Sequence, residues 1–582
     1  MSAGGDRAWP RPVPVVGDRT SAAERRAEPA GWRFREEDRA ALYEIIRARR
    51  DIRRFRPDVL DPALLRRVLA AAHQAPSVGL SQPWRFIVVT DAATRDRAAA
   101  MADRERLRQA AALEDDAGRR MRDLQLDGVR EAPAGIVVCC DRRVEPSGVL
   151  GRATFPDADL WSCACAIENL WLAARAEGLG LGWVTLFQPG ELAALVGLPS
   201  GVETLGWLCI GWPDERPPDP GLERAAWGRR APLEDLLFFE RWPGDPPPPP
   251  KSAIRGPTQR LVVEARDESD TLLTPPGSLG VLERAVERLL ALGIDATSAA
   301  ALVLAGADHP VAAQGVSTFD PSVTREVLEA AIAGESLGAA FARAVGLELV
   351  VVDAGVAGDP IHGAGLCRPV APRGDLVSED AMSRTDAERL VAYGRDLGAR
   401  LPEPLVALGE VGVANTTVAA LLASVLLDLD PELVVGLGAG GDSATLARKL
   451  DVVTTARRRL AAERRADPSD PRPLLAAAGG PELAVLAGVV LGAAERGAAI
   501  VLDGFATGVA ALVAARLEPA AAAHLVAGHR SRERAHRRVL DELGLEPLLD
   551  LRLRAGEGVG ALLATQLLRT ALRARAAAGR VR

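Results

Sequence analysis

The sequence Leu405-Val406-Ala407-Leu408-Gly409 decides the fold of the second half of the chain, because this short apolar run leads directly into the polar residue Glu410. Similar runs recur through the same half, and stretches with helical spacing separate them. They span residues 301–305, 349–353, 433–436 and 499–503. This alternation of strands and helices predicts an α/β domain with a parallel sheet of Rossmann type, and we expect an accessory helical subdomain beside it.

Polar residues follow several of these runs. They are Asp308-His309, Glu410 with Asn415-Thr416-Thr417, Asp442, and Asp503-Gly504-Phe505. Parallel sheets bind their ligands beyond the carboxyl ends of the strands, which is where these residues fall. The pattern therefore predicts a binding site at that edge of the sheet.

A glycine-rich loop, Gly436-Leu437-Gly438-Ala439-Gly440-Gly441, matches the G-x-G-x-x-G pattern of dinucleotide-binding folds. No acidic residue follows about 20 positions later to bind a ribose hydroxyl, since residues 454–459 read TTARRR. We therefore interpret the loop as one whose backbone, Gly438 included, approaches the phosphate of a mononucleotide.

A change in composition divides the 582 residues into two parts. All ten tryptophans precede residue 243, and five consecutive prolines follow at 246–250. Such a run is stiff and extended, so we interpret it as a spacer between domains. We expect a disordered extension at 1–34, one domain at 35–242, a proline-rich linker at 243–258 and a second domain at 259–582.

Charge and cysteine content exclude several classes of function. The net charge of −7 argues against a nucleic-acid partner, and no apolar run reaches the roughly 18–20 residues of a membrane span. Six cysteines form no disulfide framework, which predicts a cytoplasmic protein. Cys163 and Cys165 lie two positions apart on an expected helix without a nearby histidine, so we predict no metal site.

The first half contains expected helices and short strands, which predicts a mixed α+β domain, and two polar segments stand out in it. Residues 49–55 read RRDIRRF, a cluster of arginines that suits a phosphate or an electron-rich ring, although a solvated charge run would look the same. Residues 75–86 read APSVGLSQPWRF, a polar loop placed directly before an expected strand.

Together these segments resemble the flavin-dependent nitroreductase superfamily, and the likeness continues through Gly180-Leu181-Gly182-Trp183 to Trp227-Gly228-Arg229-Arg230. Most members have serine at the position of Asp51. This aspartate, together with residues 75–84 and 130–133, resembles the 5,6-dimethylbenzimidazole synthase family, which consumes reduced FMN and O2. The resemblance implies that FMN contacts Arg49, Arg50, Arg53, Leu80, Ser81, Gly182 and Arg229. It also implies that Asp51 shuttles protons and that Thr185 replaces a family serine, with residues 101–128 as a lid.

The second half resembles the nicotinate-nucleotide–dimethylbenzimidazole phosphoribosyltransferase family. The likeness rests on residues 273–280, 409–417, 446–449 and 554–558. It implies that Glu557 is the general base that takes the N–H proton of the attacking benzimidazole. It further implies a substrate pocket formed by Glu410, Asn415, Thr416, Gly438 and Lys449. Thr274 and Pro310 depart from the family pattern, which usually has lysine and glycine at these positions.

The two resemblances describe consecutive reactions, so we expect a bifunctional enzyme whose first product is the substrate of the second half. The implied small molecules are reduced FMN, O2, dimethylbenzimidazole and nicotinate mononucleotide, with a separate flavin reductase as supplier. The family resemblances imply a homodimer. Two alternatives for the first half stay open: an ordinary NAD(P)H-dependent nitroreductase, and a non-catalytic FMN-binding module for dimerisation.

Overall fold

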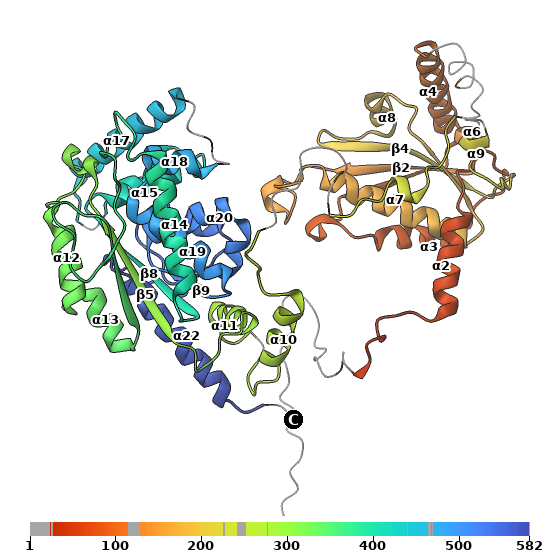
Figure 1. Cartoon of the computed structure of the whole chain (residues 1–582). Coiled ribbons are helices and arrows are strands. Elements are labelled where there is room, and N and C mark those ends of the chain that lie inside the picture. The colour runs from red at the N-terminus through yellow and green to blue at the C-terminus, as the bar shows by residue number, and fades with distance from the viewer. Residues whose placement is uncertain are drawn as a thin grey trace, which may run out of the picture. The chain divides into compact units, whose positions relative to one another are not determined.

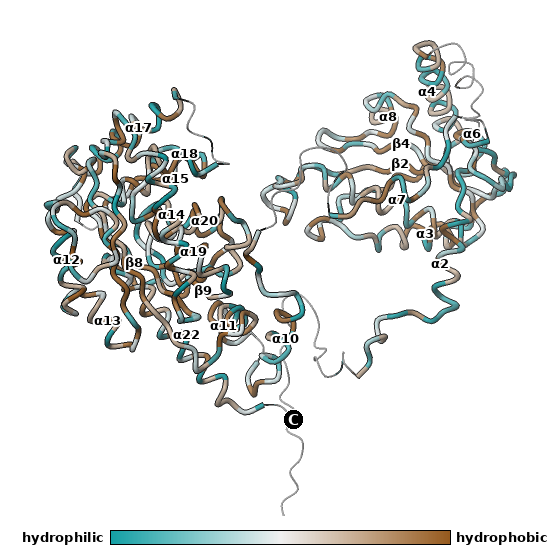
Figure 2. Tube along the Cα trace, viewed as in Figure 1, coloured by the Kyte–Doolittle hydropathy of each residue, from teal (hydrophilic) through white to brown (hydrophobic). Residues whose placement is uncertain are grey.

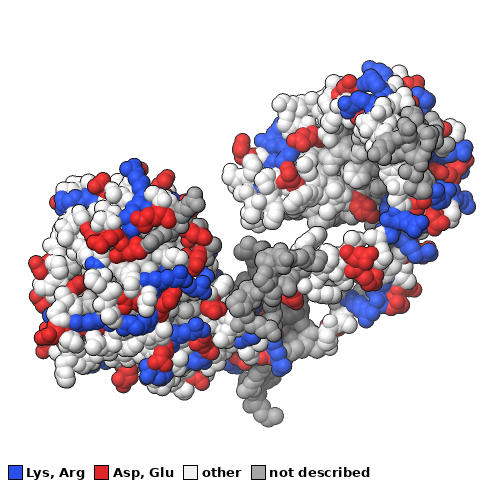
Figure 3. Space-filling model, turned by 45° about the horizontal axis from the view of Figure 1, so that its top comes forward, with Lys and Arg blue, Asp and Glu red and all other residues white. Residues whose placement is uncertain are grey.

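The structure is a computed structural model that describes residues 24–580 except 25–26, 114–120, 122–127, 225–226, 241, 243–251, 276, 439, 464–466 and 468–469. The chain forms two compact units, one spanning residues 30–246 and one containing 247–582 (Figure 1). The expected proline run at 246–250 and most of the expected N-terminal extension lie outside the described residues. Acidic and basic side chains are interspersed on the visible face of each unit (Figure 3).

The first unit, hereafter the N-terminal unit, contains an antiparallel sheet of four strands in the order β1-β2-β4-β3. The strands are β1 (Trp84–Val89), β2 (Ala134–Asp141), β3 (Gly180–Val184) and β4 (Val202–Gly211). Its helices are α2 (Glu36–Ala48), α3 (Pro62–His73), α4 (Ala92–Ala111), α6 (Gly128–Glu131), α7 (Ala158–Ala176), α8 (Pro189–Val196) and α9 (Gly221–Arg224). This arrangement confirms the expected α+β class.

Alternation along β2 gives this sheet two buried faces, because successive side chains of a strand point to opposite sides. Ile136 and Val138 pack with residues of α3 and α7, whereas Val137 and Cys139 pack with residues of α4 and α8. The start of α3 follows the sequence signal, since the Asp61 side chain accepts a hydrogen bond from the Ala63 N–H at 2.9 Å.

The second unit, hereafter the C-terminal unit, contains a parallel sheet of six strands in the order β10-β9-β8-β5-β6-β7. The strands are β5 (Ala300–Ala307), β6 (Glu348–Gly355), β7 (Gly365–Leu366), β8 (Leu405–Val411), β9 (Ala499–Leu502) and β10 (Leu525–Ala527). Apolar residues run along the central strands and along the helices that cover them (Figure 2). The expected α/β class is therefore confirmed.

Helices cover both faces of this sheet. They are α10 (Gln259–Ser269), α11 (Val281–Ala291), α12 (Ser322–Ala333), α13 (Leu337–Val345), α14 (Arg384–Arg400), α15 (Asn415–Leu426), α16 (Pro431–Val434), α17 (Ser443–Ala462), α18 (Pro471–Ala478), α19 (Pro481–Glu495), α20 (Phe505–Leu517), α21 (His536–Glu542) and α22 (Val559–Ala577). Val303 of β5 packs with the core that contains α15, α19 and α20, whereas Leu302 packs with α11 and α22. Among the described helices, none has both the length and the apolar character needed to cross a membrane.

One expected strand is wrong. Residues 433–436 do not join the sheet, because 431–434 form the short helix α16 and the chain then enters an irregular segment. Pro431 at the first position of this helix, after Asp430, favours the helical turn, and Val434 and Val435 are buried in the main core without a strand. The glycine-rich loop thus follows a helix, which removes the strand context of a dinucleotide-binding motif.

Helices α14 and α19 contact each other through their backbones. A Cβ atom on Gly394 would lie 2.0 Å from the carbonyl oxygen of Val485, and one on Gly398 would lie 2.4 Å from that of Val489. On the facing helix, a Cβ on Gly492 would lie 1.9 Å from the carbonyl oxygen of Arg395. Only glycine allows this approach, which resembles the small-residue packing of closely apposed helices.

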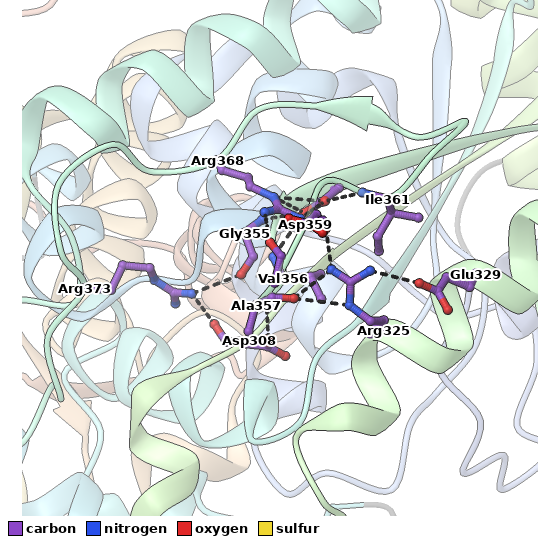
Figure 4. Close-up of polar contacts among 12 residues, drawn as sticks. Asp308, Arg325, Glu329, Gly355, Val356, Ala357, Asp359, Ile361, Arg368 and Arg373 are labelled. Atoms are coloured by element: carbon purple, nitrogen blue, oxygen red, sulfur yellow. Dashed lines mark hydrogen bonds and ion pairs between the residues drawn. The ribbon is translucent and has the colours of Figure 1, made fainter.

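Arginines hold the segment that follows β6 (Figure 4). Asp353, buried at the end of this strand, accepts hydrogen bonds from the Val356 N–H at 3.0 Å and from Nε of Arg368 at 3.0 Å. Arg325 of α12 donates to the Ala357 carbonyl at 2.7 Å, and the Ala357 N–H donates to Asp308 at 2.7 Å. The expected polar cluster at Asp308 therefore fixes a loop at the carboxyl edge of the sheet.

Candidate active sites

The C-terminal unit has a cavity of about 540 Å³ at the carboxyl edge of its sheet. The cavity wall includes six residues predicted from the sequence, namely Glu410, Asn415, Thr416, Gly438, Lys449 and Glu557. They come from the end of β8, the start of α15, the glycine-rich loop, α17 and the loop before α22. The structure thus brings together residues that are up to 147 positions apart in sequence, from 410 to 557.

Glu557 lies on a tightly packed loop. Its backbone has φ 59°, in the left-handed region, and its N–H donates to the Glu410 carbonyl at 3.1 Å. There is no space for a side chain at Gly409, where a Cβ would lie 2.7 Å from the Gly558 nitrogen. The Glu557 carboxylate accepts a hydrogen bond of 2.9 Å from the N–H of Gly338, at the start of α13. Both close contacts fix where this carboxylate enters the cavity.

Glu410 is a carboxyl group held in its protonated range. Burial, reinforced by the nearby carboxyls of Asp503 and Glu482, raises the pKa of Glu410 to about 8. The side-chain amide of Asn415 donates a hydrogen bond to Glu410, which opposes this rise. A carboxyl that is neutral near pH 7 can donate a hydrogen bond to a ligand as well as accept one.

Lys449 and the glycine-rich loop are also part of the cavity wall. The ammonium Nζ of Lys449 donates to Thr416 Oγ1 at 3.1 Å, and a Cβ on Gly438 would lie 2.7 Å from the same nitrogen. Burial lowers the pKa of Lys449, and Glu533 opposes that shift. The Gly438 N–H donates to Glu533 at 2.9 Å. A backbone without a side chain beside an ammonium group suits an anionic group of a ligand.

In the N-terminal unit, the Asp51 carboxylate accepts a hydrogen bond from the Trp183 N–H at 3.0 Å and pairs with Arg53. Gly182 lies beside Asp51, because a Cβ there would be 3.6 Å from Asp51 Oδ1 and only 2.2 Å from the Ile52 carbonyl oxygen. Burial raises the pKa of Asp51, while Arg53 opposes the rise. The structure therefore brings together three of the predicted residues, Asp51, Arg53 and Gly182.

The other arginines of the cluster contact protein groups. Arg49 lies over the Trp171 ring with its guanidinium carbon 4.5 Å from the centroid, and Arg50 donates to the Pro218 carbonyl at 2.6 Å. The buried nitrogen Nη1 of Arg53 has no hydrogen-bond acceptor within the described residues. An unmatched buried donor of this kind fits a ligand that carries carbonyl or phosphate oxygens, such as a flavin nucleotide.

The remaining predicted residues of this unit are not joined to that cluster. They are Leu80, Ser81, Thr185 and Arg229, and in the described chain no hydrogen bond or ion pair links any of them to Asp51 or Arg53. All four are exposed, Leu80 at 79%. Leu80 also has φ 53°, in the left-handed region, so its loop has an unusual backbone. Much of the expected lid, 114–120 and 122–127, lies outside the described residues.

Comparison with known proteins assigns the two units. Residues 254–580 match the family described as phosphoribosyltransferase, and residues 46–212 match the nitroreductase family. The chain belongs to this phosphoribosyltransferase family. Nicotinate-nucleotide–dimethylbenzimidazole phosphoribosyltransferase of Chloroflexus aurantiacus is 41% identical over 321 residues, which cover 54% of this chain and 90% of that protein.

Solved structures agree with this assignment. The crystal structure of CobT from Thermus thermophilus is 40% identical, covers 55% of this chain and 96% of that chain, and gives a TM-score of 0.51. The chain is therefore a fusion of a nitroreductase-family domain with a phosphoribosyltransferase-family domain, as the sequence predicted.

Two further residues of the phosphoribosyltransferase unit belong to the site: Asp503, which the sequence placed in a polar cluster at this edge without a role, and His529, which the sequence did not predict. Asp503 and His529 both line the cavity, with 3.4 Å between Asp503 Oδ1 and His529 Nδ1. Burial raises the pKa of Asp503 to about 7, although backbone N–H groups of Gly560 and Ala561 oppose the rise. Asp503 follows an apolar run, which is the signal that placed it at this edge of the sheet. His529 follows the three-residue strand β10, and no pattern in the sequence predicted this strand.

The two departures from the transferase pattern lie away from the cavity wall. Thr274 forms a hydrogen bond of 2.9 Å with Ser278, and Pro310 begins a short 3-10 helix. Neither residue lines the cavity. His309, next to Pro310, is buried with its Nε2 atom 3.1 Å from Glu482, one of the carboxyls that raise the pKa of Glu410.

Proposed function

We propose that the phosphoribosyltransferase unit, residues 259–582, transfers phosphoribose from nicotinate mononucleotide to 5,6-dimethylbenzimidazole. The products would be α-ribazole 5′-phosphate and nicotinate. The observation that carries this proposal is the cavity whose wall combines Glu557 and Glu410 with Lys449 and the glycine-rich loop. Relatives named for this reaction align with nearly their whole length, which supports it further.

The geometry supports a simple division of roles. One ring nitrogen of the benzimidazole attacks C1′ of the ribose, the bond from C1′ to the pyridinium nitrogen breaks, and nicotinate leaves with that electron pair. The proton on the other ring nitrogen passes to the Glu557 carboxylate as the general base. Lys449 and Thr416 bind the phosphate, and Gly438, which has no side chain, leaves room for it beside the Lys449 ammonium group. Glu410 and Asn415 orient the base by hydrogen bonds.

We also propose that the nitroreductase-family unit, residues 35–242, makes the dimethylbenzimidazole from reduced FMN and O2. The fit of FMN rests on the unmatched Nη1 atom of Arg53. When bound, the reduced flavin supplies the ring that becomes the benzimidazole. Asp51, whose pKa burial raises, would move protons next to it, and Arg49, Arg50 and Arg229 would bind its charged groups. Leu80, Ser81, Gly182 and Thr185 would line the ring.

A separate reductase would supply the reduced flavin. Within one chain only part of the residues predicted to bind FMN lie together, and a homodimer would bring the others to the flavin site. The tether between the two units would raise the local concentration of the intermediate.

A one-pot reaction tests both halves. Photoreduced FMN is mixed with the full-length chain, air and nicotinate mononucleotide are added, and products are identified by mass spectrometry. We expect α-ribazole 5′-phosphate without added dimethylbenzimidazole. Product that forms only when dimethylbenzimidazole is supplied would reject the synthase, and NADPH-driven flavin turnover without flavin loss would indicate an ordinary nitroreductase instead. No product with dimethylbenzimidazole present would reject the transferase.

Matched variants separate the two steps. Glu557→Gln should still release dimethylbenzimidazole from reduced FMN but should form no α-ribazole 5′-phosphate. Asp51→Asn should release no dimethylbenzimidazole from reduced FMN, but it should form α-ribazole 5′-phosphate when dimethylbenzimidazole is supplied. A chain in which either substitution stops both reactions would contradict the assignment of one reaction to each unit.

A further inference from the structure

A second hollow of about 840 Å³ adjoins the transferase cavity. Six arginines line it, namely Arg530, Arg532, Arg534, Arg537, Arg552 and Arg554, against the two acidic residues Glu533 and Asp550. We call this set the arginine hollow. Arg532, Arg534 and Arg554 also line the transferase cavity, so the two share part of their wall. A concentration of positive charge is notable in a chain whose net charge is −7.

Backbone pairing brings the arginines together from two segments. Residues 530–537 follow β10, and residues 552–554 precede the Glu557 loop. His529 and Leu549 form a parallel bridge, and the Arg530 N–H donates to the Leu549 carbonyl at 2.8 Å. Arg552 has φ 55°, in the left-handed region. The convergence is thus a fixed feature of the fold next to the candidate general base.

Half of these arginines have partners within the protein. Arg530 lies 3.5 Å from Asp550, Arg537 lies 3.8 Å from Asp541, and Arg534 donates to the Glu432 carbonyl at 3.2 Å. For Arg532, Arg552 and Arg554, no guanidinium hydrogen bond or ion pair to a described residue occurs. All three are exposed, so their forked donors can bind an oxyanion.

Acidic side chains in the wall of the transferase cavity, the 540 Å³ cavity of the C-terminal unit, would repel a substrate that carries a phosphate. Its wall carries the carboxyl groups of Glu410, Asp503, Glu533 and Glu557. Among the described lining residues, Lys449 is the only lysine or arginine outside the arginine hollow. A substrate with a phosphate therefore approaches the carboxyl groups of Glu533 and Glu557, whereas Glu410 and Asp503, whose pKa values are raised to about 8 and about 7, add less negative charge near pH 7. Charge of the opposite sign at the mouth offsets the repulsion and raises the rate of encounter.

We propose that the arginine hollow is an anion-capture site, which binds the phosphate of the nucleotide donor at the mouth before the donor moves to Lys449. This inference rests on the proposed transferase function. Arg532 and Arg552 bind only the approaching donor. The neutral benzimidazole gains nothing from the hollow. The arginines thus favour acceptance of phosphorylated over unphosphorylated donors through the association step.

The test compares the full-length chain with the double variant Arg532→Gln/Arg552→Gln. At an ionic strength of about 20 mM, we expect kcat/KM for nicotinate mononucleotide to fall about 10-fold, whereas kcat and KM for dimethylbenzimidazole stay within about twofold. At about 0.3 M salt the difference should shrink to less than about twofold, because screening removes the attraction. A loss of kcat/KM of equal size at both salt concentrations, or no loss, would overturn the proposal.

Arg573→Gln is the control for loss of positive charge away from the hollow. It removes one charge, against two in the double variant, from an exposed position of α22 about 20 Å along the helix from its start. Its kcat/KM should match the parent at both salt concentrations. Calorimetric titration with inorganic pyrophosphate gives a readout independent of catalysis. The parent and Arg573→Gln should bind it at low salt, and the double variant should bind at least about fivefold more weakly. Pyrophosphate binding by a chain without transferase activity would reject the proposed function and not the hollow, whereas equal binding by the double variant would reject the hollow.

Discussion

The Asp503 carboxylate accepts a hydrogen bond of 2.7 Å from the backbone N–H of Gly560, three residues after Glu557. The same oxygen accepts from the Ala561 N–H at 3.2 Å, so one side chain binds the first turn of α22. The position of Glu557, the candidate general base, thus depends on Asp503, which follows strand β9. Asp503 acts here as a positioning residue.

We expect Asp503→Ala to lower kcat of the transferase by about 100-fold, because a base displaced by about 1 Å loses most of its effect. Asp503→Asn keeps an oxygen that can accept the Gly560 N–H and should lose less than about 10-fold. Steady-state kinetics with supplied dimethylbenzimidazole measures both. Equal losses in the two variants would contradict a positioning role through this hydrogen bond.

The raised pKa of Glu410 predicts how stability depends on pH. Its pKa is about 8 in the folded chain against 4.5 in an unfolded one, so the folded state binds more protons between these values. The free energy of unfolding must then fall as the pH rises through this range. Asp503, with a pKa of about 7, acts in the same direction.

Glu410→Gln cannot ionise, so its unfolding temperature should fall less between pH 6 and pH 8.5 than that of the parent. Differential scanning calorimetry measures this for the full-length chain. Tryptophan fluorescence assigns the transitions, because nine of the ten tryptophans lie within residues 30–246, the N-terminal unit, and none follows residue 242. A variant with the same pH dependence as the parent would show that Glu410 is ionised in the folded chain.

Asp51 should be required for the synthase reaction but not for folding of its unit. Asp51→Asn keeps an oxygen that can accept the Trp183 N–H and removes the proton-carrying group. We expect formation of dimethylbenzimidazole to fall at least about 100-fold, while FMN binding changes less than about fivefold. Thr185→Ser removes one methyl group from an exposed side chain. Its rate of dimethylbenzimidazole formation and its affinity for FMN should stay within about threefold of the parent. Retained synthesis in Asp51→Asn would exclude Asp51 as the proton carrier.

The contact between α14 and α19 should make the C-terminal unit sensitive to a single methyl group. Gly492→Ala places a Cβ 1.9 Å from a carbonyl oxygen and must separate the helices, so we expect a loss of about 3 kcal/mol or more in stability. Gly190→Ala, in α8 with no atom within 4 Å of its Cβ position, is the control and should be neutral or slightly stabilising. Calorimetry should show that only Gly492→Ala lowers the transition of the C-terminal unit.

Six residues predicted for the transferase unit line one cavity, whereas only Asp51, Arg53 and Gly182 of those predicted for FMN lie together. Glu410 and Asn415 flank the end of β8, and carboxyl ends of parallel strands meet at one edge, so their neighbourhood follows from the fold. Leu80, Ser81 and Arg229 have no such constraint, because they lie on loops of an antiparallel domain. In this chain they do not join Asp51.

Two local errors have physical causes. The run at 433–436 has strand-like composition, but four apolar residues cannot distinguish a strand from a buried helical turn. Strand β10 is only three residues long and packs at the edge of the sheet, so no alternating pattern marks it. As a result His529, which follows it, could be found only from the structure.

The backbone contact between α14 and α19 also sets how freely this sequence can change. Gly394, Gly398, Gly488 and Gly492 each face a backbone atom at a distance no side chain can accept, although none of them lines the cavity. A saturation mutagenesis library selected only for folded protein should therefore be depleted at these four positions as strongly as a library selected for catalysis is depleted at Glu557. Comparison of the two libraries would then distinguish positions that are constrained by folding, such as these glycines, from positions that are constrained by catalysis, such as Glu557.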